Sequence, residues 1–127
     1  MRGTPGEVER LVRQTAELDS SDIPVWMEQE PGSSGKIAVA HYQRNVMQGF
    51  AFRGEASRGS KETRADPLAA AAEAGNVKMV KAPWNEAFLA EVEVFPMGAH
   101  DDQIDAASGA FAKVSASLGA RVRTLGV

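Results

Sequence analysis

Cysteine is absent from this chain of 127 residues. Disulfides and thiolate metal sites are therefore excluded. Only two histidines are present, so a metal centre built from imidazoles is not expected either. Any metal ion would have to be held mainly by carboxylate oxygens, which favour hard cations such as Mg²⁺ or Mn²⁺.

Long hydrophobic runs and a strong net charge are also missing. No apolar run approaches the roughly 20 residues that cross a bilayer, and the first residues lack the apolar core of a secretory signal. We therefore expect no membrane contact and a cytoplasmic location. The formal net charge of −3 differs from the basic character usual in DNA-binding modules, so the composition counts weakly against a nucleic-acid partner.

Helical and strand patterns alternate along the chain. Thr4, Pro5 and Glu7 form a capping box that predicts a helix over residues 5–18. The hydrophobic periodicity and the turn residues predict the remaining elements, which are strands over 23–28, 50–53 and 77–80 and helices over 35–48, 60–74, 83–93 and from His100 onward. This order predicts one α/β domain, residues 1–127, with two or three strands pairing in parallel.

Three details of these helices can be checked. Pro67 should kink or break the helix over 60–74. The helix over 83–93 should turn an apolar group inward, namely Trp84, Phe88, Leu89 and Val92. The last helix should carry one apolar stripe, namely Ile104, Ala107, Phe111, Val114 and Leu118.

The first candidate site is the acidic end of the strand over 23–28. Glu28 and Glu30 should share one face of the strand. Ligands of open α/β sheets gather beyond the carboxyl ends of strands, although acids there are often only solvated. The following glycines and Lys36 do not match a Walker A loop, which needs a wider glycine spacing and a Ser or Thr after the lysine. A helix start there could still contact a DNA phosphate.

The second candidate is a group of three aspartates. Asp101 and Asp105 lie one helical turn apart, and Asp102 lies about 100° around the helix. Acids in a first turn are favoured by the helix dipole, so capping alone is one explanation. Three acids within five residues exceed what a cap needs, so a metal role is the other.

The third candidate is a basic strip. Arg58, Lys61 and Arg64 recur every three residues around the start of the helix over 60–74. Such a strip suits contacts with DNA phosphates, although an ordinary solvated face has the same composition.

Three segments, EQEPGSSGK, GSKETRADP and FPMGAHDDQIDA, occur in an order that resembles the nuclease region of phage terminase large subunits. The resemblance covers roughly residues 3–112. It implies a partial RNase H-like fold, related to RuvC resolvases and retroviral integrases, with a small, mostly parallel sheet flanked by helices. Such nucleases hold two Mg²⁺ or Mn²⁺ ions that activate a water for in-line attack on phosphorus.

The resemblance also assigns roles. Glu28 matches an acid on the fourth strand of the family fold. Asp101 matches the acid of the C-terminal helix, with Asp102 beside it and Asp105 as a further metal ligand. Lys61 and Arg64 match the family's basic stretch near the DNA path, and Lys36 and Arg58 are further candidate DNA contacts. Double-stranded DNA, bound weakly, and the terminase and portal components in the bacterial host cytoplasm are the implied partners.

One family feature has no counterpart here, because no strand with an acid precedes Thr4. We therefore expect a fragment without its first strands and first catalytic acid, with weak or no activity alone. The strand near Val25 would then keep an unpaired edge, which favours a homo-oligomer. The alternatives are a non-catalytic remnant that acts in assembly and a resolvase-like nuclease unrelated to packaging.

Overall fold

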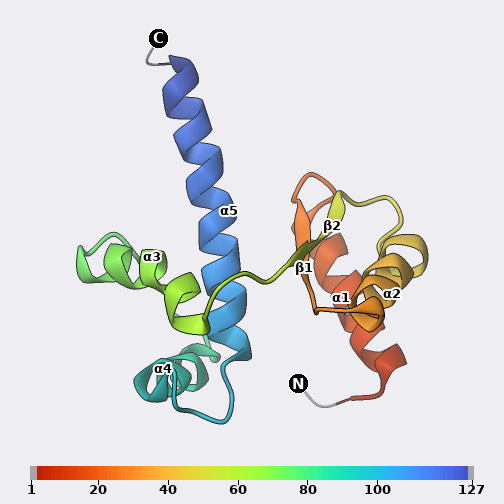
Figure 1. Ribbon diagram of the computed structural model, residues 1–127, viewed down its shortest axis with the longest axis horizontal. Coiled ribbons are helices and arrows are strands. Elements are labelled where there is room, and N and C mark those ends of the chain that lie inside the picture. Colours follow the sequence, from red (N-terminus) through yellow and green to blue (C-terminus); the bar gives the residue numbers. More distant parts are fainter. Residues whose placement is uncertain (1–2, 126–127) are drawn as a thin grey trace. The chain divides into compact units, whose positions relative to one another are not determined.

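The structure is a computed structural model that describes residues 3–125 and the side chains of residues 3–116. Contacts divide the chain into two compact units, residues 1–57 and residues 58–127 (Figure 1). No helix formed by the described residues is long and apolar enough to cross a membrane. The single domain expected from the sequence stays a prediction.

The first unit begins with helix α1, Pro5–Asp19. Thr4 and Glu7 form the expected capping box, in which the Glu7 N–H donates to Thr4 Oγ1 over 3.2 Å and the Thr4 N–H donates to Glu7 Oε2 over 2.9 Å. These bonds satisfy backbone donors that have no partner inside the helix. The prediction of a helix over residues 5–18 is confirmed.

A two-stranded parallel sheet follows, formed by β1, Val25–Gln29, and β2, Phe52–Ala56. Val25 pairs with Phe52, and Glu28 pairs with Glu55. Parallel strands need a long crossover, which α2, Ser33–His41, and the π-helix η1, Tyr42–Val46, provide. Parallel pairing is therefore confirmed.

The predicted helix over 35–48 begins two residues earlier and changes type. Gly35 allows the Glu30 backbone to approach this first turn closely, because a Cβ there would lie 1.9 Å from the Glu30 carbonyl oxygen. At the other end the Met47 N–H donates to the Tyr42 carbonyl over 2.8 Å, which is the spacing of a π-turn. This turn places Val46 and Met47 in the small core of the unit, with Ala16 and Phe52.

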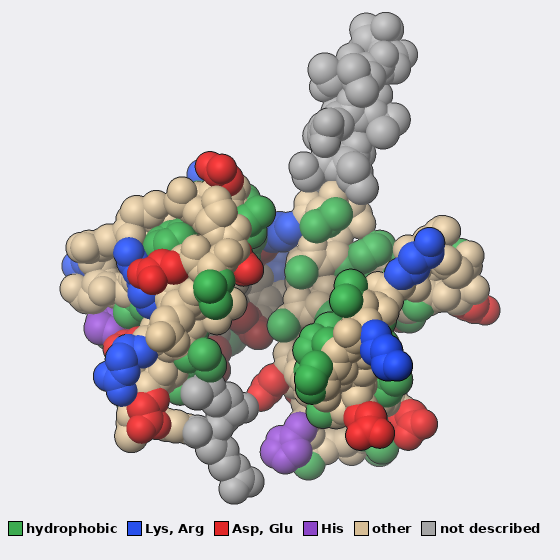
Figure 2. Space-filling model, turned by 180° about the vertical axis from the view of Figure 1, so that it is seen from behind, with side chains coloured by type: hydrophobic (Ala, Val, Ile, Leu, Met, Phe, Trp, Pro, Cys, Tyr) green, Lys and Arg blue, Asp and Glu red, His purple; other side chains and the backbone are tan. Residues whose placement is uncertain are grey.

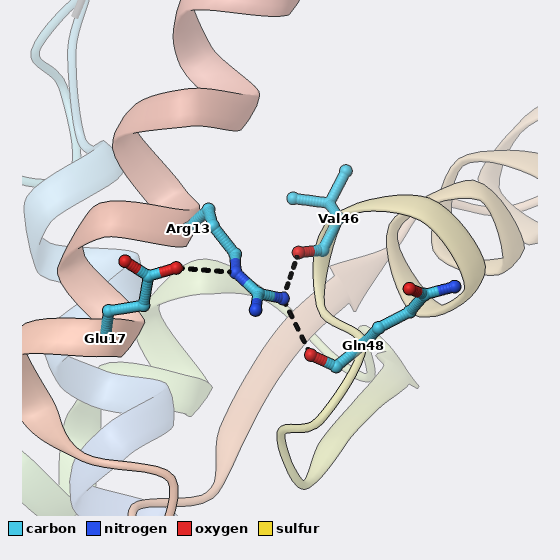
Figure 3. Close-up of polar contacts among 4 residues, drawn as sticks. All are labelled: Arg13, Glu17, Val46 and Gln48. Carbon is cyan, nitrogen blue, oxygen red and sulfur yellow. Dashed lines mark hydrogen bonds and ion pairs between the residues drawn. The ribbon is translucent and has the colours of Figure 1, made fainter.

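Arg13 joins α1 to the end of η1 (Figure 3). Its Nη1 donates to the carbonyl oxygens of Val46 over 3.0 Å and Gln48 over 2.7 Å. Its Nε donates to Glu17 over 2.9 Å, and the guanidinium lies 4.8 Å from the centre of the Phe50 ring. Carbonyl groups at a helix end lack partners within the helix, so Arg13 is the donor that they need.

The second unit contains α3, Lys61–Glu73, α4, Asn85–Val94, and α5, Asp102–Leu125. Ser60 caps α3 as predicted, and its Oγ accepts from the Thr63 N–H over 3.1 Å. The helix runs from Lys61 to Glu73 with Pro67 inside it, so the predicted break does not occur, whereas the kink stays a prediction. Both α3 and α4 pack against α5.

Residues 77–80 do not form the predicted third strand. The described residues offer them no strand partner, and the Val80 side chain is 81% exposed. Asn85 instead organises the segment, because its Nδ2 donates to the Val80 carbonyl over 3.1 Å and its Oδ1 accepts from the Ala82 N–H over 2.8 Å. These bonds hold a loop that leads into α4.

The apolar side chains of α4 differ most from expectation. Trp84, Leu89 and Val92 are exposed, whereas Phe88 is half-buried. The helix is turned so that Glu91 faces α5, where its carboxylate accepts backbone N–H groups. The inward assignment of the three exposed residues was therefore wrong. Hydrophobic side chains are visible at the surface of both units in Figure 2.

The α5 stripe is confirmed only at its start. Ile104 is buried, and Ala107 and Phe111 are half-buried. Val114 is 58% exposed, so the stripe ends before it. The side chain of Leu118 lies outside the described residues.

Candidate functional site

Glu28 lies on the exposed face of β1, one residue before the strand ends. Ser57, which follows β2, donates a hydrogen bond from its Oγ to the Glu28 carboxylate. Glu55 is the register partner of Glu28, and paired residues of neighbouring strands share a face. The first unit therefore gathers two carboxylates and a hydroxyl at the carboxyl end of its sheet. Sequence reasoning missed Glu55, although the alternation after Phe52 places it on the exposed face.

Glu30 does not share this face, because β1 ends at Gln29. Its backbone carbonyl approaches Gly35, so this stretch makes a tight turn into α2. Lys36 is exposed in the first turn of α2, and no side chain caps this helix. The close approach of the Glu30 carbonyl thus accounts for the glycine at position 35. Lys36 lies at the start of a helix, where a phosphate contact is favourable.

Asp101 directly precedes α5, Asp102 is its first residue, and Asp105 follows within the first turn. Asp102 is exposed, whereas Asp101 and Asp105 are half-buried. The Asp105 N–H donates to the Asp101 carbonyl over 2.9 Å, which continues the helical bonding backward by one residue. The aspartates therefore share one short region, as their spacing predicts.

Glu91 of α4 holds the start of α5. Its Oε1 accepts from the N–H groups of Gln103 over 2.8 Å and Ile104 over 3.0 Å, and its Oε2 accepts from Gln103 Nε2 over 2.9 Å. Sequence reasoning missed this residue, since an acid on a different helix carries no local capping signal. Glu91 fixes the segment from which Asp101 and Asp102 project.

Lys61 and Asp101 form an ion pair between the start of α3 and the start of α5. The Asp101 side chain is 15% exposed and that of Lys61 is 48% exposed. The hydrogen bond to Asp101, and then its negative charge, raise the pKa of Lys61 above the ordinary lysine value. One predicted DNA-binding residue therefore contacts one predicted metal ligand.

The two other members of the basic strip differ in exposure. Arg58 is exposed just before α3, whereas Arg64 is half-buried within α3. Arg58 and Lys61 thus remain accessible to a phosphate group, and Arg64 is accessible only in part.

Carboxylate oxygens are the right donors for Mg²⁺ or Mn²⁺. Glu28 belongs to the first unit, and Asp101, Asp102 and Asp105 belong to the second. Within residues 3–116, however, no three His, Asp or Glu side chains are grouped so that they could hold a metal ion. The donor chemistry fits the expected metal, but the described residues do not make up a complete centre.

The parallel β1–α2–β2 arrangement and the surrounding helices make this a mixed α/β protein, and the family match places it in the RNase H-like class. A sequence profile of the terminase RNaseH-like domain matches residues 2–113, so the chain belongs to this family. No curated protein and no solved structure matches the chain. The resemblance to the nuclease region of phage terminases and the partial RNase H-like fold are thereby confirmed.

Proposed function

We propose that the chain takes part in metal-dependent endonucleolytic cleavage of DNA during phage genome packaging, as the C-terminal nuclease portion of a terminase large subunit. The observation that carries this proposal is the family match over residues 2–113. Double-stranded DNA and the terminase and portal components are the proposed partners. Taken alone, the chain should cleave DNA weakly or not at all.

The proposed metal ligands are carboxylates. Glu28 at the end of β1 and Asp101 and Asp102 at the start of α5 are the main candidates, with Asp105 as a further one. Support comes from the chemistry of the donors, because carboxylates in a chain without cysteine favour Mg²⁺ or Mn²⁺. Ends of strands and starts of helices are also rigid positions from which to present such groups.

Calorimetry with Mn²⁺, titrated to about millimolar concentration, tests the metal role. We expect weak binding that is lost in Asp101→Asn and reduced in Asp102→Asn and in Glu28→Gln. Asp66→Asn is the matched control, since Asp66 is an exposed acid of α3 outside the proposed ligands, and it should bind Mn²⁺ like the wild type. If neither the wild type nor any variant gives metal-dependent heat, the chain has no metal centre of its own.

DNA binding should come from phosphate contacts by Lys36, Arg58, Lys61 and Arg64. Lys36 and Lys61 lie in the first turns of α2 and α3, where backbone N–H groups also favour an anion. Phosphate contacts read no bases, so the affinity should not depend on sequence. Four such contacts would lower the affinity about 150-fold between 50 and 200 mM salt.

Fluorescence anisotropy with two duplexes of equal length and different sequence measures this binding. Equal affinities that fall steeply with salt support the proposal, and Arg58→Ala should reduce the salt dependence by about one counterion. Binding that is selective for one duplex, or that does not respond to salt, would contradict it.

A second candidate function is assembly without catalysis. It is favoured by the sheet, because β1 and β2 pair only with each other among the described residues, and each strand keeps one open edge. Trp26, 42% exposed on β1, adds apolar surface at this sheet. Open apolar edges promote strand pairing between chains.

Light scattering coupled to size exclusion distinguishes the two candidates. A dimer that Trp26→Lys converts to a monomer would favour assembly, provided that the variant keeps the wild-type circular dichroism. A monomer at high concentration would remove self-assembly as a function and leave the nuclease proposal in place.

A further inference from the structure

Lys61 is the first residue of α3, and Asp101 lies 40 positions later, directly before α5. Their ion pair is therefore a tertiary contact between two helix starts. The Asp101 side chain is mostly buried, whereas the lysine side chain reaches it from a half-exposed position. A carboxylate that is mostly withdrawn from water thus has a cation of the protein itself as its partner.

Further acids lie near this ion pair. Glu62 follows Lys61 directly in α3, and Asp105 lies in the first turn of α5. The pair is therefore located in an acidic part of the second unit. Such a position is also where a divalent cation would be stabilised.

We infer that Lys61 competes with the divalent cation for Asp101, so that the ammonium group and the metal ion are alternative partners of one carboxylate. This inference rests on the proposed function, in which Asp101 is a metal ligand. It assigns Lys61 a role that neither DNA binding nor helix packing requires. The role is to set how tightly the metal is held.

The Lys61 ammonium group and the metal ion exclude each other because both are positively charged. A divalent ion bound to the carboxylate oxygen that accepts from Lys61 Nζ would lie next to the ammonium group, and the two cations repel each other strongly at that separation. Metal binding at this oxygen therefore requires Lys61 to move away. If the pair forms in about two thirds of the molecules, the apparent metal affinity is about threefold lower than that of the unpaired carboxylate.

The test compares Mn²⁺ affinities by calorimetry at about 0.15 M salt, where exposed charges more than about 8 Å apart are largely screened. Lys61→Met removes the pair, and Lys61→Arg keeps a cation in place. Lys61→Met combined with Asp66→Asn removes the pair without changing the formal charge, because Asp66 is an exposed acid of α3 outside the proposed ligands. Lys78→Met removes an exposed lysine from the loop before α4 and is the control for a general charge effect.

With that population of the pair, competition predicts about a threefold rise in Mn²⁺ affinity for Lys61→Met and for the charge-neutral double variant. Lys61→Arg and Lys78→Met should stay at the wild-type value. Adding Asp101→Asn to Lys61→Met should remove the gain. Thermal melting of each variant serves as the check that it is folded.

Two other results overturn the inference in distinguishable ways. If Asp101→Asn loses Mn²⁺ binding but both variants lacking Lys61 keep the wild-type affinity, competition is wrong and the metal role of Asp101 stands. If Lys61→Met gains affinity but the charge-neutral double variant does not, the effect is one of net charge and not of occupancy. If no variant binds Mn²⁺, the inference fails together with the proposed metal centre.

Discussion

Glu91→Ala should loosen the start of α5 and lower the stability of the protein. The Glu91 carboxylate accepts three hydrogen bonds, two of them from backbone N–H groups of the first helical turn. These groups have no acceptor within the helix, so alanine leaves them to water or unpaired. The segment that carries Asp101 and Asp102 loses its tie to α4.

The magnitude follows from the contacts. Loss of a helix N-cap costs about 0.5–2 kcal/mol. Hydrogen bonds to a charged group contribute about 1.5–3 kcal/mol each at most, and this half-buried carboxylate lies toward the low end. We expect a loss of about 2 kcal/mol in the free energy of unfolding. For a chain of 127 residues, this corresponds to a fall of roughly 8 °C in Tm, at about 4 °C per kcal/mol.

Thermal denaturation measures the loss of stability, and amide hydrogen exchange measures the loosening of the start of α5. The amides of Gln103 and Ile104 should exchange faster in Glu91→Ala, because their acceptor is gone. Glu91→Gln keeps one carbonyl oxygen for these amides but cannot accept from Gln103 Nε2 with its own NH₂ group, so it should lie between wild type and alanine. Glu93→Ala, which removes an exposed acid of the same helix, should change neither quantity.

The reasoning would be refuted by a Glu91→Ala protein whose Tm stays within about 2 °C of the wild type while both amides keep their protection. Such a result would mean that α5 is held by its apolar contacts alone and that Glu91 does not position Asp101 and Asp102.

Three further predictions concern other parts of the molecule. Arg13→Met should cost about 2 kcal/mol in urea unfolding, because the carbonyls of Val46 and Gln48 lose a charged donor, whereas Arg10→Met on the exposed side of α1 should be close to neutral. Because the pKa of Lys61 is raised in the folded protein, the stabilisation by its ion pair is complete below the ordinary lysine pKa of about 10.4 and is lost as the pH rises through the folded-state value. Wild type should therefore lose more stability than Lys61→Met between about pH 10 and 12, and parallel curves would contradict this. If Lys61 leaves Asp101 to contact a phosphate, DNA and Mn²⁺ should raise each other's affinity by the same factor in calorimetric titrations, and this coupling should vanish in Lys61→Met.

Local signals in the sequence were sufficient for most helix boundaries. The cap residues Thr4 and Ser60 act within three residues of their own position, so their effect does not depend on distant parts of the chain. The same holds for the positive-φ glycines Gly49 and Gly75 near the ends of helical segments. Parallel pairing of β1 and β2 also followed from the sequence, because two short strands separated by a helix have few other connections.

Elements that depend on a partner were decided only by tertiary structure. Residues 77–80 have strand composition, but a strand needs a neighbouring strand with free backbone groups. Here the side chain of Asn85 forms hydrogen bonds with the backbone of Val80 and Ala82 instead. Helix α4 is oriented so that Glu91 accepts hydrogen bonds from N–H groups of α5. This orientation leaves Leu89 and Val92 exposed. Hydrophobic periodicity contains no information about such a polar contact.

The same distinction between local sequence signals and tertiary contacts applies to the candidate site. Residue type, spacing and family resemblance predict Glu28, Asp101 and Asp102 as metal ligands and Lys61 as a DNA contact, and these roles stay predictions. The contact between Lys61 and Asp101 joins residues 40 positions apart and exists because α3 packs against α5. Composition sets which ionic groups the chain contains, since that depends on covalent structure alone. Packing of the helices decides which of these groups meet, because an ion pair depends on distance in space and not on distance along the chain.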